Sequence, residues 1–233
     1  MKKKLIAHIQ TFAHKMQLNF ADWELLLKAL THSTYAFEND YLGLEHNERL
    51  EYLGDTVLQL VISAELYQRL PEVDEGKLTN LRSLIVREET QAAIAREIGL
   101  DSYLLLGNGA EKSGDREKDS VLCDAMEAVI GALYLDQGYD RAKAFIEEHF
   151  AEMTERAISG KLIYDFKSLF IQYCQAHNYD YSFTTESSEG PSHDIHFTRV
   201  LTLNGRVVGK GVAGNKKQAD QLAAKEAAKL IKL

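Results

Sequence analysis

Residues 47–58, Asn-Glu-Arg-Leu-Glu-Tyr-Leu-Gly-Asp-Thr-Val-Leu, predict a helix of unusual composition. At about 100° per residue, Glu48, Glu51 and Asp55 fall within an arc of about 60°. The far side of the same helix carries apolar residues, namely Leu50, Leu53, Val57, Leu60, Val61 and Ala64. Three acids therefore share one edge of a largely apolar helix.

A second helix of this kind is predicted over residues 122–133, Leu-Cys-Asp-Ala-Met-Glu-Ala-Val-Ile-Gly-Ala-Leu. It places Asp124 and Glu127 at positions i and i+3 among residues typical of a core. Buried carboxylates are costly unless they are neutralised, and carboxylate oxygens on facing helices suit Mg²⁺ or Mn²⁺. Each acid alone also fits an exposed face or an ion pair with Arg49. Together, the five acids favour a divalent-cation site.

Helical spacing of apolar residues extends over the first 157 residues, as in Leu5, Ile9, Phe12 and Met16. The chain has two prolines, Pro71 and Pro191, and we expect Pro71 to end a helix. The sequence therefore predicts an all-α N-terminal domain.

The pattern changes after residue 160. A helix is expected over 165–176, a strand over 179–185, a polar loop over 186–193, and alternation typical of a strand over 195–203. Asn204-Gly205 predicts a tight hairpin into a strand over 206–212, and a helix follows over 216–230 with Asn215 as its N-cap. This order indicates a small α+β domain, α-β-β-β-α.

Composition and charge narrow the class of protein. The 233 residues are 45% hydrophobic and 27% charged, which is typical of globular domains. No apolar run is long enough to span a membrane, so we expect a cytosolic protein, with Cys123 and Cys174 as buried thiols. Residues 1–160 carry a net charge of −11 and residues 161–233 carry +3. This asymmetry fits an acidic part that gathers cations and a basic part that binds a polyanion, although two ordinary solvated surfaces would look the same.

The two acidic stretches resemble the signature motifs of the ribonuclease III family. Further co-linear similarity lies at Leu30-Thr31-His32-Ser33, at Val73-Asp74-Glu75-Gly76, and from Leu106-Gly107 to Glu111-Lys112-Ser113-Gly114. The resemblance implies an endonuclease that cuts double-stranded RNA as a homodimer and leaves 5′-phosphate and 3′-hydroxyl ends. It divides the chain into an endonuclease domain over 1–158, a linker over 159–164 and a double-stranded-RNA-binding domain over 165–233.

The resemblance also assigns roles to residues. Glu51, Asp55, Asp124 and Glu127 match the metal-binding acids, with Asp55 and Glu127 at the catalytic positions, while Glu48 and Glu75 match further acids of the cleft. The implied cofactor is Mg²⁺, with Mn²⁺ as a substitute, and no organic cofactor is implied. Tyr52 stands where the family usually has a phenylalanine that packs across the dimer.

The basic C-terminal part resembles the double-stranded-RNA-binding domain. The loop around Gly190-Pro191-Ser192-His193 and the helix start at Lys216-Lys217 match its motifs, and such modules bind phosphates and 2′-hydroxyls rather than base edges. The implied RNA contacts are Gln172, Pro191, His193, Lys216, Lys217 and Gln221. Ile171 stands where the family has a glutamine, and this substitution puts one RNA contact in doubt.

Two other functions remain open at this level. One is an RNA-binding or ribosome-associated protein that kept the fold and lost catalysis, but every expected acid is present. The other is a structural cation-binding helical protein, which leaves the basic domain unexplained. We expect an endoribonuclease whose substrates, by family analogy, include ribosomal RNA precursors and other structured RNAs.

Overall fold

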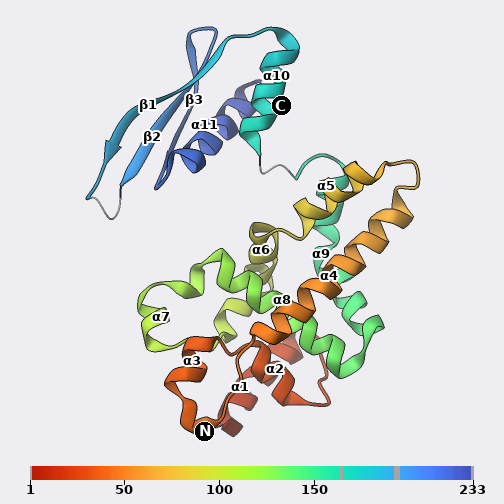
Figure 1. Ribbon diagram of the computed structural model, residues 1–233. Coiled ribbons are helices and arrows are strands. Elements are labelled where there is room, and N and C mark those ends of the chain that lie inside the picture. The colour runs from red at the N-terminus through yellow and green to blue at the C-terminus, as the bar shows by residue number, and fades with distance from the viewer. Residues whose placement is uncertain (1, 163–164, 192–194, 232–233) are drawn as a thin grey trace. The chain divides into compact units, whose positions relative to one another are not determined.

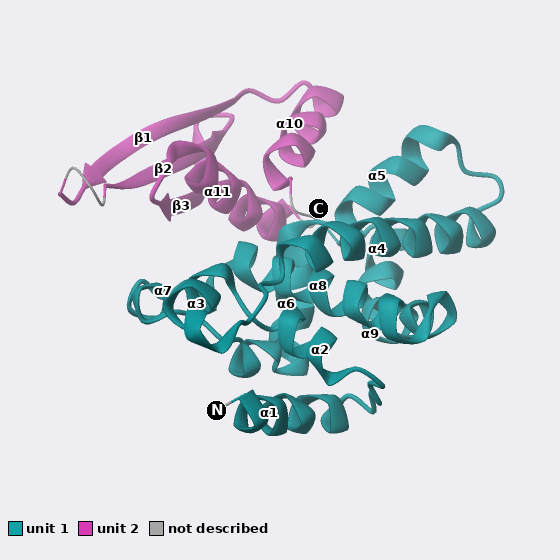
Figure 2. Cartoon of the chain, turned by 60° about the horizontal axis from the view of Figure 1, so that its bottom comes forward, with its two compact units in different colours: residues 1–162 teal, residues 163–233 magenta. Residues whose placement is uncertain are grey.

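The structure is a computed structural model that describes residues 2–162, 165–191 and 195–231. The chain divides into two compact units, residues 1–162 and 163–233, which Figure 2 colours separately.

The regular elements of the first unit are all helices in its described residues, as the sequence predicts, apart from one isolated bridge between Thr31 and Leu105 (Figure 1). Its α-helices are α1 (Lys2–Lys15), α2 (Trp23–Ala29), α3 (Ser33–Glu38), α4 (Glu48–Arg69), α5 (Glu75–Ile85), α6 (Glu88–Ile98), α7 (Asn108–Lys112), α8 (Asp119–Gln137) and α9 (Tyr139–Ile158). Short 3₁₀ helices lie between them, namely η1 (Asp40–Leu42), η2 (Leu100–Tyr103) and η3 (Asp115–Glu117). Helix α4 ends one residue before its C-cap Leu70, so Pro71 stops it as expected.

Helix α8 is the centre of this unit. Residues 121–123 and 125–133 are all buried, because α8 packs against α2, α4, α6 and α9. A helix that is apolar on nearly every side needs such a surround. Any acid on α8 is therefore held close to the core.

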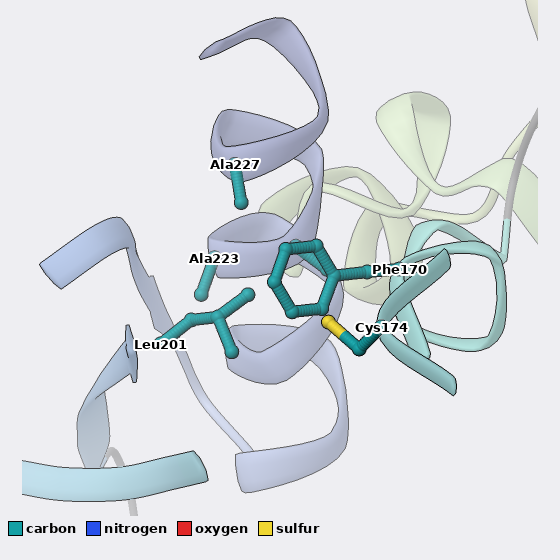
Figure 3. Close-up of a cluster of buried hydrophobic side chains, with 6 residues drawn as sticks. Phe170, Cys174, Leu201, Ala223 and Ala227 are labelled. Atoms are coloured by element: carbon teal, nitrogen blue, oxygen red, sulfur yellow. The ribbon is translucent and has the colours of Figure 1, made fainter. Parts of the chain in front are cut away.

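The second unit has the predicted order: α10 (Phe166–His177), β1 (Tyr181–Glu189), β2 (His196–Leu203), β3 (Arg206–Ala213) and α11 (Lys216–Ile231). The three strands form one antiparallel sheet in the order β1-β2-β3. Phe170 and Cys174 of α10, Leu201 of β2, and Ala223 and Ala227 of α11 form its buried core (Figure 3). The predicted α+β domain is confirmed.

Helix α11 lies against β3 at two glycines. A Cβ atom on Gly209 would overlap the carbonyl oxygen of Ala223, and one on Gly211 that of Ala219. The small residues on both surfaces therefore allow close packing of helix on sheet.

One predicted boundary in this unit is wrong. Residues 186–189 are not loop: β1 continues to Glu189, which pairs with His196 of β2. The register shifts between Thr185 and Ser187, so a bulge takes up one residue and the polar segment stays paired. Strand pairing uses the backbone, and the exposed side chains of this segment gave no apolar alternation to indicate it.

Candidate active site

Helices α4 and α8 cross in backbone contact at two glycines. A Cβ atom on Gly54 would overlap the carbonyl oxygen of Glu127, and one on Gly131 would overlap that of Leu50. Because neither glycine has a side chain to separate the helices, the backbones meet directly. The crossing sets the acids of α4 beside those of α8.

The charges of neighbouring predicted metal ligands raise the pKa values of Glu51 and Glu127. Burial raises the pKa of Glu51, and the charges of Asp124 and Asp55 raise it further. Glu127 is only 8% exposed; burial raises its pKa to about 7 despite a hydrogen bond from Gln91, and the charge of Asp55 also raises it. The structure thus brings Glu51, Asp55, Asp124 and Glu127 near one another at the helix crossing.

Hydrogen bonds from neutral side chains hold the two predicted catalytic acids. Oε1 of Glu127 accepts from Nε2 of Gln91 at 2.6 Å and from Sγ of Cys123 at 3.6 Å. The two carboxylate oxygens of Asp55 accept from Nε2 of Gln59 at 2.8 and 2.9 Å. The hydrogen bond from Gln91 favours the charged form of Glu127.

The donor set fits a hard divalent cation. In the described part of the chain, no three His, Cys, Asp or Glu side chains are placed so that they could hold a metal ion as they stand. All four ligands offer carboxylate oxygens, which Mg²⁺ and Mn²⁺ prefer. Burial also raises the pKa of Asp124, so a bound cation would offset a cost that three of the acids share.

The two accessory acids lie differently from one another. The side chain of Glu48 is exposed, 3.7 Å from Nδ1 of His46, and its charge raises the pKa of Glu51. Glu75, at the start of α5, accepts a hydrogen bond from Thr79 at 3.2 Å and lines a groove between α4 and α5. Glu75 is not among the charges that shift the pKa of Glu51 or Glu127. Within one described chain, Glu48 joins the cluster and Glu75 does not.

An exposed apolar stripe runs along α4 next to its acids. Tyr52 is 79% exposed, Leu60 56% and Tyr67 74%, and Thr56 between them is also exposed. The sequence placed Leu60 on the apolar side of the helix, which was expected to be buried. In the single chain, however, Leu60 is exposed to solvent. The stripe includes the position predicted for dimer contacts, Tyr52.

The predicted RNA-binding residues lie in the second unit. Gln172, Pro191, Lys216 and Lys217 are exposed, and His193 lies outside the described residues. Asn215 caps α11 by accepting from the backbone N–H of Gln218 at 2.9 Å, so the two lysines occupy a capped helix N-terminus, a position that favours anions.

Gln221 has contacts that the sequence did not indicate. Its Oε1 accepts from the backbone N–H of Lys167 at 3.1 Å, and its Nε2 donates to Asp165 at 2.8 Å. Since Asp165 also accepts from the backbone N–H of Ser168 at 3.0 Å, the pair caps α10. These bonds use the amide oxygen of Gln221 and one hydrogen of its amide nitrogen.

Sequence reasoning missed three polar side chains that hold the site: Gln59, Gln91 and Cys123. It also missed Asp220, which is 4% exposed and binds Nζ of Lys167 and Nε of Arg199, each at 2.6 Å. A glutamine or aspartate within an apolar helix face could have indicated a buried hydrogen-bond network. The sequence does not identify its partners, because they lie on other elements.

Comparison with known proteins identifies the family. The "Ribonuclease-III-like" family model matches residues 22–153. Ribonuclease 3 of Desulfotalea psychrophila is 44% identical over 221 residues, which are 94% of this chain and 91% of that protein. Ribonuclease 3 of Enterococcus faecalis is 44% identical over 214 residues, covering 91% and 92% of the two chains. The chain belongs to the ribonuclease III family.

Two further findings extend this assignment. The "Double-stranded RNA binding motif" model matches residues 166–231, so this ribonuclease III family member is an endoribonuclease with an RNA-binding second unit. A solved structure of the nuclease domain of ribonuclease III from Campylobacter jejuni is 35% identical to this chain, with a TM-score of 0.58. The match covers 62% of this chain and 96% of that domain, which is described with a flexible region involved in dimer formation.

Among the described residues, no helix combines the length and apolarity of a membrane span.

Proposed function

We propose that this ribonuclease III family member hydrolyses phosphodiester bonds of double-stranded RNA with two Mg²⁺ ions per site and leaves 5′-phosphate and 3′-hydroxyl ends. The observation that carries the proposal is the four-acid cluster at the α4–α8 crossing, where Gly54 and Gly131 bring the helix backbones together. Membership of the family favours divalent-cation use, and the all-carboxylate donor set favours Mg²⁺ or Mn²⁺.

The proposed ligands are Glu51, Asp55, Asp124 and Glu127, with Asp55 and Glu127 as the residues most critical for turnover. When bound, Mg²⁺ would lower the pKa of the attacking water and neutralise charge on the leaving oxygen. The protein's own contribution is to fix carboxylates through Gln59 and Gln91. Glu48 and Glu75 are proposed to help hold RNA or water at the rim.

The second unit is proposed to supply affinity for the duplex. Lys216 and Lys217 would contact phosphates across the narrow major groove of A-form RNA, while Gln172, Pro191, His193 and the other amide N–H of Gln221 would reach neighbouring sugars and phosphates. Nζ of Lys216 lies 5.6 Å from the ring of Phe197, which limits the volume that this lysine explores. This division of labour follows the charge difference between the two parts of the chain.

The exposed stripe of α4 is proposed as the interface of a homodimer. Tyr52, Leu60 and Tyr67 are large and solvent-exposed in the single chain, and a second copy would bury them. Because the stripe adjoins the acids, dimerisation would bring two sites close together. We also propose that the endonuclease domain ends at residue 158 and that the RNA-binding domain begins at residue 165. Ribosomal RNA precursors and other structured RNAs are the proposed substrates.

The proposal is tested by incubating the full chain with a long RNA duplex or its separated strands, with and without Mg²⁺. We expect cleavage of the duplex alone, only with Mg²⁺, and fragments that a ligase can join only through their 5′-phosphates. Duplex binding without cleavage in any divalent cation would instead support the alternative, an RNA-binding protein that has lost catalysis.

A further inference from the structure

Gln91 is a polar residue at a core position of α6. It is completely buried, and its helix neighbours Ala92, Ile94 and Ala95 are buried too. Nε2 of Gln91 donates to the carbonyl oxygen of Val86 at 2.8 Å and to Oε1 of Glu127 at 2.6 Å. Both amide hydrogens are thus committed, one to the backbone between α5 and α6 and one to a proposed metal ligand.

The other end of the same amide is less well satisfied. Oε1 of Gln91 is buried and has no hydrogen-bond partner among the described residues. A buried acceptor without a partner destabilises a fold, and an apolar side chain of similar size would avoid that cost. The same apolar side chain would leave the carbonyl oxygen of Val86 and Oε1 of Glu127 without this donor. The two bonds of its amide nitrogen therefore explain the glutamine, and one of them reaches a proposed metal ligand.

We infer that Gln91 is a positioning residue for the cation site. Anchored at the carbonyl oxygen of Val86, it fixes Oε1 of Glu127, and Cys123 also bonds to that oxygen. Both contacts leave Oε2 for a cation. The inference rests on the proposed function, because it assigns Gln91 to the same site through one of its ligands. Partners that orient a ligand in this way typically change metal affinity by about 10- to 100-fold.

The test compares the full-length chain with Gln91→Leu and Gln91→Met, which lack the donor but differ in shape. Binding of Mn²⁺ is measured from the electron paramagnetic resonance signal of the free ion, without RNA. We expect both variants to bind Mn²⁺ about tenfold more weakly. Both should lose stability to a similar extent, because each removes the donor to the carbonyl oxygen of Val86, so binding is measured well below their melting temperatures. Thr154→Val is the matched control, because Thr154 is also completely buried, lies on α9 and has an unpartnered hydroxyl; it should bind Mn²⁺ as the wild type does.

Cleavage kinetics provide a second readout. At low Mg²⁺ concentration, both Gln91 variants should have a reduced kcat with an unchanged KM for the duplex, and raising the Mg²⁺ concentration should restore kcat. Wild-type Mn²⁺ affinity and wild-type Mg²⁺ dependence in both variants would overturn the inference. A large loss of Mn²⁺ affinity in one variant and none in the other would also overturn the inference, because it would follow the shape of the new side chain and not the missing donor.

Glu127→Gln separates failure of this inference from failure of the proposed site. If Glu127→Gln weakens Mn²⁺ binding but the two Gln91 variants do not, the role of Gln91 is wrong and the metal site stands. If the wild type and Glu127→Gln bind Mn²⁺ equally, the proposed site and the role of Gln91 are both wrong.

Discussion

Buried charges in this protein are held in two different ways. At the proposed active site, burial and neighbouring carboxylates raise the pKa values of Glu51 and Glu127. In the second unit, Asp220 lies between Lys167 and Arg199. Burial alone would raise the pKa of Asp220, but hydrogen bonds from Arg199 and Lys167, with their charges, outweigh it and lower the pKa. The first arrangement is proposed to take a cation from solution, whereas the second is neutralised by Lys167 and Arg199.

Asp220→Asn should destabilise the second unit by about 3 kcal/mol, because it leaves two cations without their buried anion. Trp23, the chain's one tryptophan, lies in the first unit. Urea unfolding followed by tryptophan fluorescence should therefore be unchanged, while the part of the circular dichroism transition that reports the second unit should shift. Glu186→Gln, which removes a half-exposed partner of Lys210, should cost less than about 1 kcal/mol. Equal effects of the two substitutions would contradict this account.

The same network makes stability depend on pH. The pKa of Asp220 is lower in the folded chain than in the unfolded one, so its contribution is fully present above the unfolded value of about 3.9. That contribution is lost as pH falls through the folded value. We expect the difference in stability between wild type and Asp220→Asn to be constant near neutral pH and to shrink below about pH 4. If the difference in unfolding free energy between wild type and Asp220→Asn stays constant in acid, Asp220 does not act through its charge.

Helix crossings decide where the acids of this protein meet. Gly54→Ala places a methyl group against the carbonyl oxygen of Glu127, so the helices must separate. We expect a loss of stability of about 1–3 kcal/mol, read by the fluorescence of Trp23, and a fall in cleavage rate because the acids move apart. Gly109→Ala on α7 is the control, since a Cβ atom there has open space. A stable, fully active Gly54→Ala would mean that the crossing does not set the site.

The sequence predicted single elements well because their signals are local. Asn204 and Gly205 both adopt positive φ, 48° and 77°, as a tight hairpin of this kind requires, and Asn215 caps α11 as expected. The end of β1 was missed because its pairing with β2 uses the backbone, of which the polar side chains of residues 186–189 give no sign. Gln91 was missed because its sequence position gives no sign that its amide faces Glu127. The acids themselves could be found because five carboxylates on apolar helices conflict with core packing.

At the scale of the whole molecule, one surface is proposed to join two copies. Tyr52→Asp puts a charge on the exposed stripe of α4, so we expect the dimer dissociation constant to rise at least about thirtyfold, a typical effect at an interface hot spot. Sedimentation velocity over a range of concentrations measures it. Tyr41→Asp is the control, because Tyr41 is similarly exposed but lies on η1. A dimer that tolerates the first change and not the second would move the interface.

RNA binding belongs to the basic unit. The double variant Lys216→Ala/Lys217→Ala should weaken binding equally on two unrelated RNA duplexes, measured with Ca²⁺ in place of Mg²⁺. The slope of log affinity against log salt should flatten by up to about one unit per lysine, since each contacted phosphate releases counterions. B-form DNA should bind much more weakly, because it lacks 2′-hydroxyls and has a different groove width. An unchanged slope would place the phosphate contacts elsewhere.

Single-turnover cleavage of a saturating RNA duplex by Glu127→Gln tests directly whether the acids at the α4–α8 crossing cut RNA. This variant keeps the shape of the side chain and removes its charge, while Glu147→Gln, on α9 beside Lys143, changes an exposed acid away from the crossing. We predict that Glu127→Gln lowers the cleavage rate at least about a hundredfold with duplex affinity unchanged, because a lost metal ligand costs several kcal/mol of transition-state stabilisation, and that Glu147→Gln has no effect. Cleavage by Glu127→Gln at a rate near that of the wild type would contradict the account.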